Sequence, residues 1–166
     1  MKNIILALLV ALSVIGCNSN SQENKNVEPK LVVGKSLQDL KLNDQNEKPQ
    51  TLPADTEIVF FSFSKPVGHM CNAFLEKHPE NYLAQHHAVY VADVSPAPSI
   101  IKNMFILPDL KELKFPILLI NDDKLSAEYT KGMDKESIVV VTLENGTIKK
   151  IDNLKDAKAL EEKLTK

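Results

Sequence analysis

The stretch Ile58-Val59-Phe60-Phe61-Ser62-Phe63, followed shortly by Gly68-His69-Met70-Cys71, decides the fold that this sequence predicts. The first six residues form a nearly continuous apolar run, which is typical of a strand buried on both faces of a sheet. A helical pattern then begins near Met70 and places Phe74 and Leu75 on one side. We therefore expect a central strand that leads into a helix, with Cys71 in the first turn of that helix.

Strands and helices alternate on the carboxyl side of this stretch. Residues 88–92 and 116–120 are two more buried strands, and a helical pattern follows each. After the first of them, Pro98 suits the first position of a helix. The spacing of four large side chains then suits one apolar face of this helix; these are Ile100, Ile101, Met104 and Phe105.

Two hairpins and a last helix complete the pattern. Residues 40–52 form a short hairpin around a polar centre, and residues 138–151 form another with Asn145-Gly146 as a type I′ turn. An amphipathic helix over 154–164 closes the chain. Strands separated by helices pair in parallel through right-handed crossovers, so we expect a mixed sheet with helices on both faces.

This order of elements resembles the thioredoxin fold, and within it the peroxiredoxin-like (alkyl hydroperoxide reductase/thiol-specific antioxidant) branch. The likeness runs from about residue 33 to 164, and residues 91–108 also resemble a stretch of uncharacterised bacterial proteins with this fold. It implies a three-layer α/β/α sandwich with a mixed central sheet, an N-terminal hairpin and a C-terminal helix. The motifs that carry it are Val33-Gly34 through Asp44, Phe115-Pro116 with Asp122, Ala127-Glu128-Tyr129, and Val139–Leu143 with Gly146.

The catalytic motifs of those enzymes are incomplete in this chain. Thioredoxin-type exchange needs a Cys-x-x-Cys pair, but the matching tetrad begins with Gly68, so the attacking cysteine is missing. Peroxiredoxins use Pro-x-x-x-Thr/Ser-x-x-Cys with an arginine. Here Pro66 lies five residues before Cys71, Gly68 replaces the hydroxyl residue, and the chain has no arginine, whose planar donors lysine lacks. Two-thiol exchange within one chain is excluded.

Cys71 and His69 remain the candidate catalytic residues. A thiol in a first helical turn is favoured as thiolate by the helix dipole, and His69 could pair with it. The competing interpretation is a small buried side chain that packs the helix on the sheet, because free cysteines are among the most buried residues. We favour burial.

Metal binding is a third hypothesis, and we expect no cofactor. His69 and Cys71 offer soft ligands, and His86-His87 is a second pair. Copper chaperones of the Sco type also place a thioredoxin fold on a membrane anchor, but they use Cys-x-x-x-Cys. The first cysteine position falls on Val67 here.

The amino terminus predicts where the protein resides. Residues 1–16 resemble a bacterial lipoprotein signal peptide, with an apolar run too short for a transmembrane helix. Cys17 would be lipidated, and 17–30 would form a flexible tether to one domain over 31–166. Asn18 favours sorting to the outer membrane over the inner one. The protein would then face the periplasm of a bacterial cell envelope.

Composition narrows the function classes. The chain carries 20 basic and 22 acidic residues, a formal charge of −2 that becomes −3 once Lys2 is removed with the signal. We therefore expect no nucleic-acid partner. The sequence predicts a redox-inactive thioredoxin-like domain that binds an envelope protein or a small ligand, around residues 65–71 and 95–99.

Overall fold

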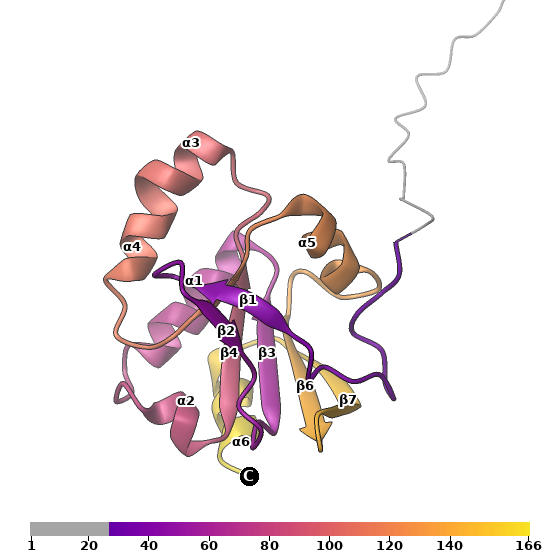
Figure 1. The fold of residues 1–166 in the computed structure, drawn as a ribbon. Helices are drawn as coiled ribbons and strands as arrows, with labels where there is room; N and C mark the ends of the chain where they lie inside the picture. Colours follow the sequence, from indigo (N-terminus) through magenta and orange to yellow (C-terminus); the bar gives the residue numbers. More distant parts are fainter. Residues whose placement is uncertain (1–26) are drawn as a thin grey trace, which may run out of the picture.

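A computed structural model describes residues 27–166 and folds them around one seven-stranded sheet (Figure 1). The predicted signal peptide and Cys17 lie outside the described residues. The strand order is β2-β1-β5-β4-β3-β6-β7. In chain order the elements are β1 (Lys41–Asp44), β2 (Pro49–Thr51), β3 (Ile58–Ser62), α1 (Lys65–Leu75), α2 (Tyr82–Gln85), β4 (Ala88–Asp93), α3 (Ser99–Ile101), η1 (Lys102–Ile106), α4 (Leu107–Lys111), β5 (Leu118–Ile120), α5 (Asp123–Thr130), β6 (Ile138–Glu144), β7 (Thr147–Leu154) and α6 (Ala157–Leu164).

The centre of the sheet is the strand that the sequence marked first. All five residues of β3 are buried, as expected for a strand covered on both faces. β3 pairs in parallel with β4, which pairs in parallel with β5, whereas β6 and the hairpin β1–β2 are antiparallel. The predicted mixed sheet is confirmed, and the carboxyl ends of β3, β4 and β5 lie together at one edge.

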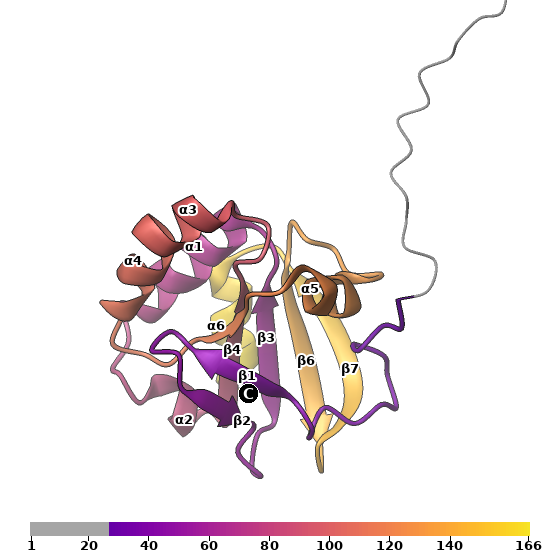
Figure 2. The ribbon, with the colours of Figure 1, turned by 45° about the horizontal axis from the view of Figure 1, so that its top comes forward.

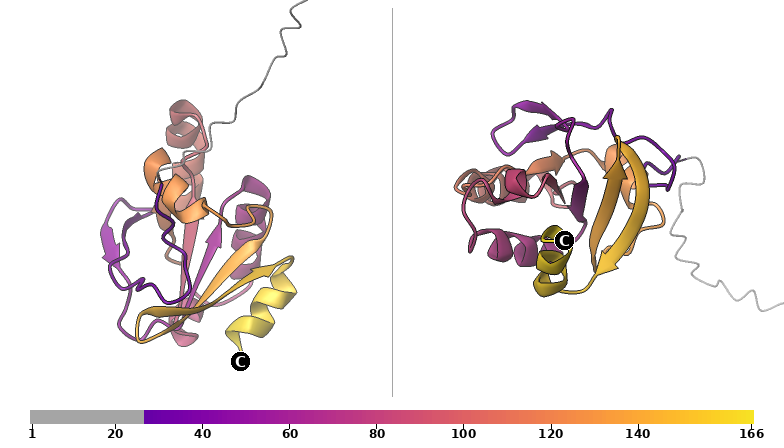
Figure 3. Two further views of the ribbon diagram at one scale, coloured as in Figure 1. Left: turned by 90° about the vertical axis from the view of Figure 1, so that its right-hand side faces the viewer. Right: turned by 90° about the horizontal axis from the view of Figure 1, so that it is seen from below.

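Two apolar cores lie on opposite faces of this sheet because successive strand residues point to opposite sides. Phe60 belongs to the core under α1, α4 and α6, and Phe61 belongs to the core under α5 and the segment 31–42. The hairpin β1–β2 and α6 lie on opposite sides of β3 in the view from below (Figure 3, right). Figure 2 shows α3 and α4 beside α1, with α5 standing apart over β6.

Helix α1 begins earlier than predicted. Ser64 is its extended N-cap, and Pro66 falls in the first turn, where its missing N–H costs nothing. Cys71 is therefore the seventh residue of the helix, in its second turn. The prediction that it occupies the first turn is wrong, and the helix dipole has little effect at that depth.

The segment after β4 forms one helical column with a wide turn in the middle. Pro98 is its N-cap rather than its first residue, and the backbone N–H of Leu107 donates to the carbonyl of Lys102, five residues back. Pro108 explains the wide turn, because it has no N–H for the carbonyl of Met104 and its ring would clash there in a regular helix.

Two different sets of apolar side chains lie on this column. Leu110 is buried in the core, with Ile106 and Leu107 packed against it. The four residues whose spacing suits one apolar face are exposed to solvent; they are Ile100, Ile101, Met104 and Phe105. The predicted apolar residues therefore do not supply the side of the column that packs on the core.

The second hairpin has the predicted turn. Asn145 and Gly146 join β6 to β7 with φ values of 50° and 72°, both in the left-handed region that a type I′ turn requires. A Cβ at Gly146 would meet the side chain of Gln38, which is exposed and can move away, so the positive φ is what requires glycine there. Across residues 27–166, no helix is both long enough and apolar enough to cross a bilayer.

Candidate functional site

The amino-terminal part of α1 is the place where the sequence suggested thiol chemistry. In the structure, the side chain of Cys71 there is buried under the helix. Val67, Cys71, Phe74 and Leu75 recur at helical spacing and form the buried face of the helix. The Cys71 side chain has no solvent-exposed surface. Burial raises its pKa from 9.0 to about 12, with only partial opposition from a hydrogen bond to Tyr90. Its neutral thiol is therefore the form present near neutral pH.

A short polar chain beneath α1 includes this thiol. The Ser62 Oγ and the Tyr90 Oη lie 2.8 Å apart, and both side chains are buried. If the single hydroxyl hydrogen of Tyr90 is directed at Cys71, then Ser62 donates to Tyr90. Burial raises the pKa of Tyr90 well above its ordinary value. All three groups are thus neutral and satisfied within the chain.

Gly68 lies directly over this polar chain. A Cβ at that position would lie 3.6 Å from the Ser62 Oγ and 3.9 Å from the Tyr90 Oη, both ordinary contact distances, so α1 rests on the pair and the space would also admit an alanine. The ring of Tyr90 also stacks on Phe60, with centroids 4.8 Å apart. Sequence reasoning did not identify Ser62 and Tyr90; the only available signal was a polar residue at the end of an apolar run.

His69 does not reach the thiol. It is exposed, and two helical residues are separated by about 200° around the axis, so it lies on the side of α1 opposite to Cys71. The hypothesis that His69 assists Cys71, or binds a metal with it, has no geometric support.

The other histidines are also apart from one another. The His86 ring packs on Tyr82 with centroids 4.4 Å apart, whereas the His87 Nδ1 lies 2.9 Å from the Oδ2 of Asp55. The His78 ring also stacks on Tyr82, with ring centroids 4.0 Å apart. Within residues 27–166, no three His, Cys, Asp or Glu side chains converge as metal ligands would.

Two hollows lie at the carboxyl ends of the parallel strands. One, of about 440 Å³, is lined by residues 95–99 with Lys102, Asn121, Asp122 and Asp123. It coincides with one of the two segments that the sequence indicated as a binding surface. The other segment, 65–71, lines neither of these hollows.

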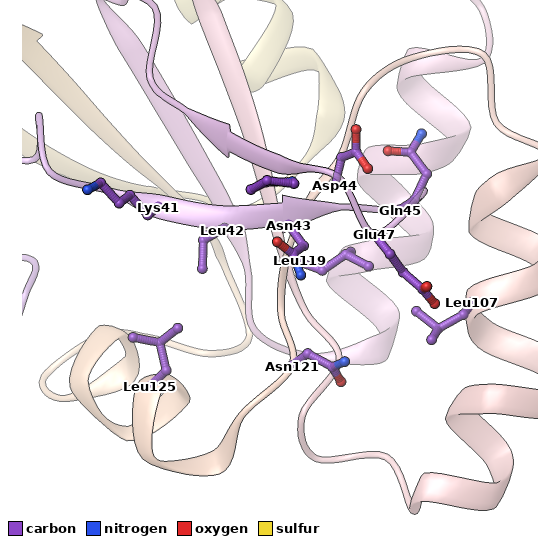
Figure 4. Close-up of a pocket in the computed structure, with 11 residues that line it drawn as sticks. Lys41, Leu42, Asn43, Asp44, Gln45, Glu47, Leu107, Leu119, Asn121 and Leu125 are labelled. Carbon is purple, nitrogen blue, oxygen red and sulfur yellow. The ribbon is translucent and has the colours of Figure 1, made fainter.

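The second hollow is larger, about 510 Å³, and lies where β1, β5, α4 and α5 meet. In Figure 4, Leu42 of β1 and Leu125 of α5 point toward each other across it, and the amide groups of Asn43 and Asn121 lie close by. Four leucines and Pro49 give the hollow apolar walls, and the charged residues Lys41, Asp44 and Glu47 line it together with the amides. Its volume is in the range of small-ligand sites. Asn121 contributes to both hollows.

Comparison with known proteins defines the fold. No family model and no curated protein matches the chain. It is similar in structure to a candidate thiol:disulfide interchange protein DsbE from Chlorobium tepidum, with a TM-score of 0.54, 13% identity, and coverage of 81% of this chain and 96% of that one. A peroxiredoxin-like protein from Aquifex aeolicus gives a TM-score of 0.53 at 9% identity, covering 84% and 89% of the respective chains.

A candidate protein disulfide isomerase from Bacteroides thetaiotaomicron is similar to the same extent, with a TM-score of 0.51, 15% identity, and coverage of 84% and 89%. The chain therefore has a thioredoxin-like α/β fold with a mixed seven-stranded sheet and a C-terminal helix, as the resemblance predicted. Its structural neighbours include peroxiredoxins and thiol-disulfide oxidoreductases at low identity. At such identities the likeness defines the fold and not the chemistry.

Proposed function

We propose that this protein is a lipid-anchored binding protein of the bacterial cell envelope, whose thioredoxin-like domain carries no thiol catalysis. The observation that carries the proposal is the environment of Cys71. The only cysteine among residues 27–166 is fully buried, and its pKa is raised to about 12. Nucleophilic attack requires a thiolate that a substrate can reach, and this thiol provides neither.

The competing proposal is a one-thiol oxidoreductase or peroxidase that acts through Cys71 with His69. It would require α1 to open so that the thiol leaves the core and an external thiol can resolve the product. Burial of the thiol and exposure of His69 on the far side of the helix both count against it. A soft-metal carrier using the same two residues meets the same geometric objection.

The binding function is supported by the two hollows. They lie where strand-to-helix connections leave the carboxyl ends of parallel strands, which is the usual position of binding crevices in open α/β sheets. The larger hollow offers a small molecule apolar walls with amide donors and acceptors, and the smaller one offers Lys102 beside Asp122 and Asp123. A peptide segment or a small polar ligand fits this chemistry.

The anchor is supported by the sequence of residues 1–17, and it places the domain in the envelope. Metabolic labelling with a fatty acid, followed by fractionation, tests it. We expect label on the wild type in the membrane fraction, and a Cys17→Ser variant that loses the label and becomes soluble. Equal labelling and fractionation of the two proteins would contradict lipidation at Cys17.

Peroxide turnover tests the absence of catalysis. The purified protein is mixed with hydrogen peroxide and dithiothreitol, and peroxide consumption is compared with that of a Cys71→Ala variant. We expect the same rate for both proteins. Consumption by the wild type well above that of the variant would establish the competing one-thiol enzyme.

Photo-crosslinking in intact cells tests binding. A photoreactive residue at Asn121, which contributes to both hollows, should yield a discrete adduct, whereas one at the exposed Lys149 of β7 should not. A lack of any adduct at position 121, or the same adducts at both positions, would count against binding at this edge.

A further inference from the structure

Most of the large apolar side chains that solvent reaches gather on one short piece of the domain. Among residues 27–166, five such side chains are exposed, and four of them lie within six residues of α3 and η1. We call these four the α3–η1 patch; their exposed fractions are 71% for Ile100, 45% for Ile101, 64% for Met104 and 55% for Phe105. Contiguous exposed apolar surface of this kind marks a contact site.

The patch is a consequence of how the helical column is built. Ile106, Leu107 and Leu110 already supply the side that packs on the core, so the patch is not a core face left uncovered by a missing element. The wide turn at η1, imposed by Pro108, belongs to a class of helix irregularities that is frequent at functional sites.

The charge around the patch suits an apolar or interfacial environment. Between Ser99 and Pro108 the only charged residue is Lys102, and its Nζ lies 3.4 Å from the backbone oxygen of Asn121. No carboxylate within this stretch would lose its water if the patch were covered; the nearest acidic residues on another element are Asp122 and Asp123, which line the adjoining hollow with Ser99 and Lys102. A lysine beside exposed aliphatic and aromatic side chains is compatible with a helix that lies in a membrane interface.

The described chain begins at the same end of the sheet as the patch. Lys131, which ends α5, donates from its Nζ to the carbonyl of Val27 at 2.7 Å, and the N–H of Lys30 donates to the carbonyl of Glu128 at 2.9 Å. α5 follows β5 and α3 follows β4, so both helices lie at the carboxyl ends of the parallel strands. Both are at the top of Figure 1, and α3 projects beyond α5 in the left view of Figure 3.

The length of chain before Val27 permits this end to reach a bilayer. Nine residues lie between Cys17 and Val27, and the ten steps from one to the other span at most about 33–36 Å when extended. A domain of this size has a radius of gyration of about 14 Å. Acyl chains on Cys17 would therefore hold the patch within reach of the membrane surface, where a high effective concentration makes a weak contact sufficient.

A second copy of the chain fits the patch less well. Stable interfaces bury roughly 800 Å² on each partner and involve about 20–30 residues a side, whereas the patch is four side chains on two helical turns. We propose that the α3–η1 patch inserts into the headgroup region of the bilayer to which Cys17 anchors the protein. This inference rests on the proposed anchoring. It orients the carboxyl edge of the sheet, and the hollow at 95–99, toward the membrane surface.

The absence of tryptophan from the chain allows a single-reporter test. Phe105→Trp places a reporter in the patch. Val33→Trp is the matched control, because Val33 is 60% exposed and precedes Gly34, whose N–H donates to the carbonyl of Ile148 near the β6–β7 turn at the opposite end of the sheet. Each variant of the full chain, lipidated in cells, is reconstituted into vesicles of three parts phosphatidylethanolamine to one part phosphatidylglycerol, with and without spin-labelled lipid quenchers.

We expect the emission of Phe105→Trp to shift to shorter wavelength and to be quenched several-fold more than that of Val33→Trp. Adding Ile100→Ser and Met104→Ser should abolish this difference while the protein still floats with the vesicles. Equal quenching at the two reporters in a protein that floats would overturn membrane docking and leave the anchor intact. Failure of the protein to float would instead overturn the anchor, and the docking inference with it.

If a second copy of the chain covered the patch instead of the membrane, the Phe105→Trp reporter would respond to protein concentration without any lipid. Among residues 27–166 every core residue lies within 31–164, so we expect a Cys17→Ser chain without lipid to fold and to be suitable for study in solution. If Phe105→Trp in that chain changes emission with protein concentration, and the chain elutes as a dimer, a second copy covers the patch and membrane docking is overturned. Circular dichroism confirms that each variant is folded.

Discussion

Helices α1 and α3 start from the same structural situation and end with opposite surfaces. Each follows the carboxyl end of a parallel strand, and each carries large or soft apolar residues at helical spacing. α1 buries Val67, Cys71, Phe74 and Leu75, whereas α3 and η1 expose Ile100, Ile101, Met104 and Phe105.

The difference shows that two helices in similar positions of one fold can carry a buried apolar face in one case and an exposed apolar face in the other. Beneath α1, the hydroxyl groups of Ser62 and Tyr90 are hydrogen-bonded to each other, and Cys71 is buried beside them. In the column of α3, η1 and α4, the core-facing side consists of Ile106, Leu107 and Leu110, and the patch residues face solvent. The thiol on α1 is closed to solvent, and the accessible apolar surface lies on α3 and η1, which follow the next strand, β4.

A matched pair of phenylalanine truncations measures this contrast directly. Phe74 in α1 is 5% exposed and Phe105 in η1 is 55% exposed. We expect Phe74→Ala to lower the free energy of unfolding by about 3–5 kcal/mol, through lost burial and a cavity. Phe105→Ala should change it by no more than about 0.5 kcal/mol.

Urea denaturation of the lipid-free Cys17→Ser chain provides both values. A loss of several kcal/mol from Phe105→Ala would mean that the patch is part of the core, and the contrast between the two helices would be lost.

The polar chain under α1 gives a smaller effect. Tyr90→Phe removes the hydroxyl group and leaves the Ser62 Oγ buried without its partner, which should cost about 1–3 kcal/mol. Because the double variant Ser62→Ala/Tyr90→Phe removes both polar groups, it should recover part of that loss. If the double variant is as unstable as the sum of the single variants, the two hydroxyl groups are not coupled, and α1 is held by apolar packing alone.

The pH dependence of stability gives the smallest effect. The folded state holds the Cys71 proton up to about pH 12, whereas the unfolded thiol loses it above 9.0. The contribution is therefore constant below pH 9 and declines as the pH rises from there toward 12. By pH 10 the wild type should have lost about 1 kcal/mol more than Cys71→Ala, since one pKa unit corresponds to about 1.4 kcal/mol.

Parallel stability curves for the two proteins up to pH 10 would mean that the thiol has an ordinary pKa. The other tyrosine and lysine titrations affect both proteins, so the difference between the curves reports Cys71 together with Tyr90, whose pKa Cys71 helps to raise.

Much of the fold was readable from the sequence because its strongest signals are local. The apolar run 58–63 predicts a strand buried on both faces, and Asn145-Gly146 predicts a type I′ turn; both are present. The mixed sheet followed from the alternation of elements. Each of these features depends on a period or a dihedral preference that a short segment reveals by itself.

Helix starts and helix faces were less predictable because they depend on tertiary context. Pro66 and Ser64 extend α1 by about a turn and a half toward its amino end, which moved Cys71 out of the first turn. The spacing of Ile100, Ile101, Met104 and Phe105 is compatible with a core face and with an exposed one. The turn imposed by Pro108, together with the burial of Leu110, decides between them.

Some features of the candidate site were also predictable from the sequence, and others were not. The incomplete motif around Cys71 led us to predict that two-thiol exchange is absent, which stays a prediction, and the segment 95–99 does line a hollow. The partners of Cys71 were not predictable, because Ser62 and Tyr90 come from two different strands that the sequence does not register against each other. The larger hollow combines β1, β5, α4 and α5, and no local pattern marks it.

The rate at which the Cys71 thiol is alkylated in the native protein tests the central claim most directly. A Cys17→Ser chain leaves Cys71 as the only thiol, and iodoacetamide labelling at pH 8 is followed by mass spectrometry with and without guanidinium chloride. If the thiol is buried and neutral, we expect the native protein to be labelled orders of magnitude more slowly than the unfolded chain. Peroxide should not slow the labelling of the native protein further. Native labelling as fast as, or faster than, that of the unfolded chain would show a reachable thiolate and would contradict the account of a domain without thiol catalysis.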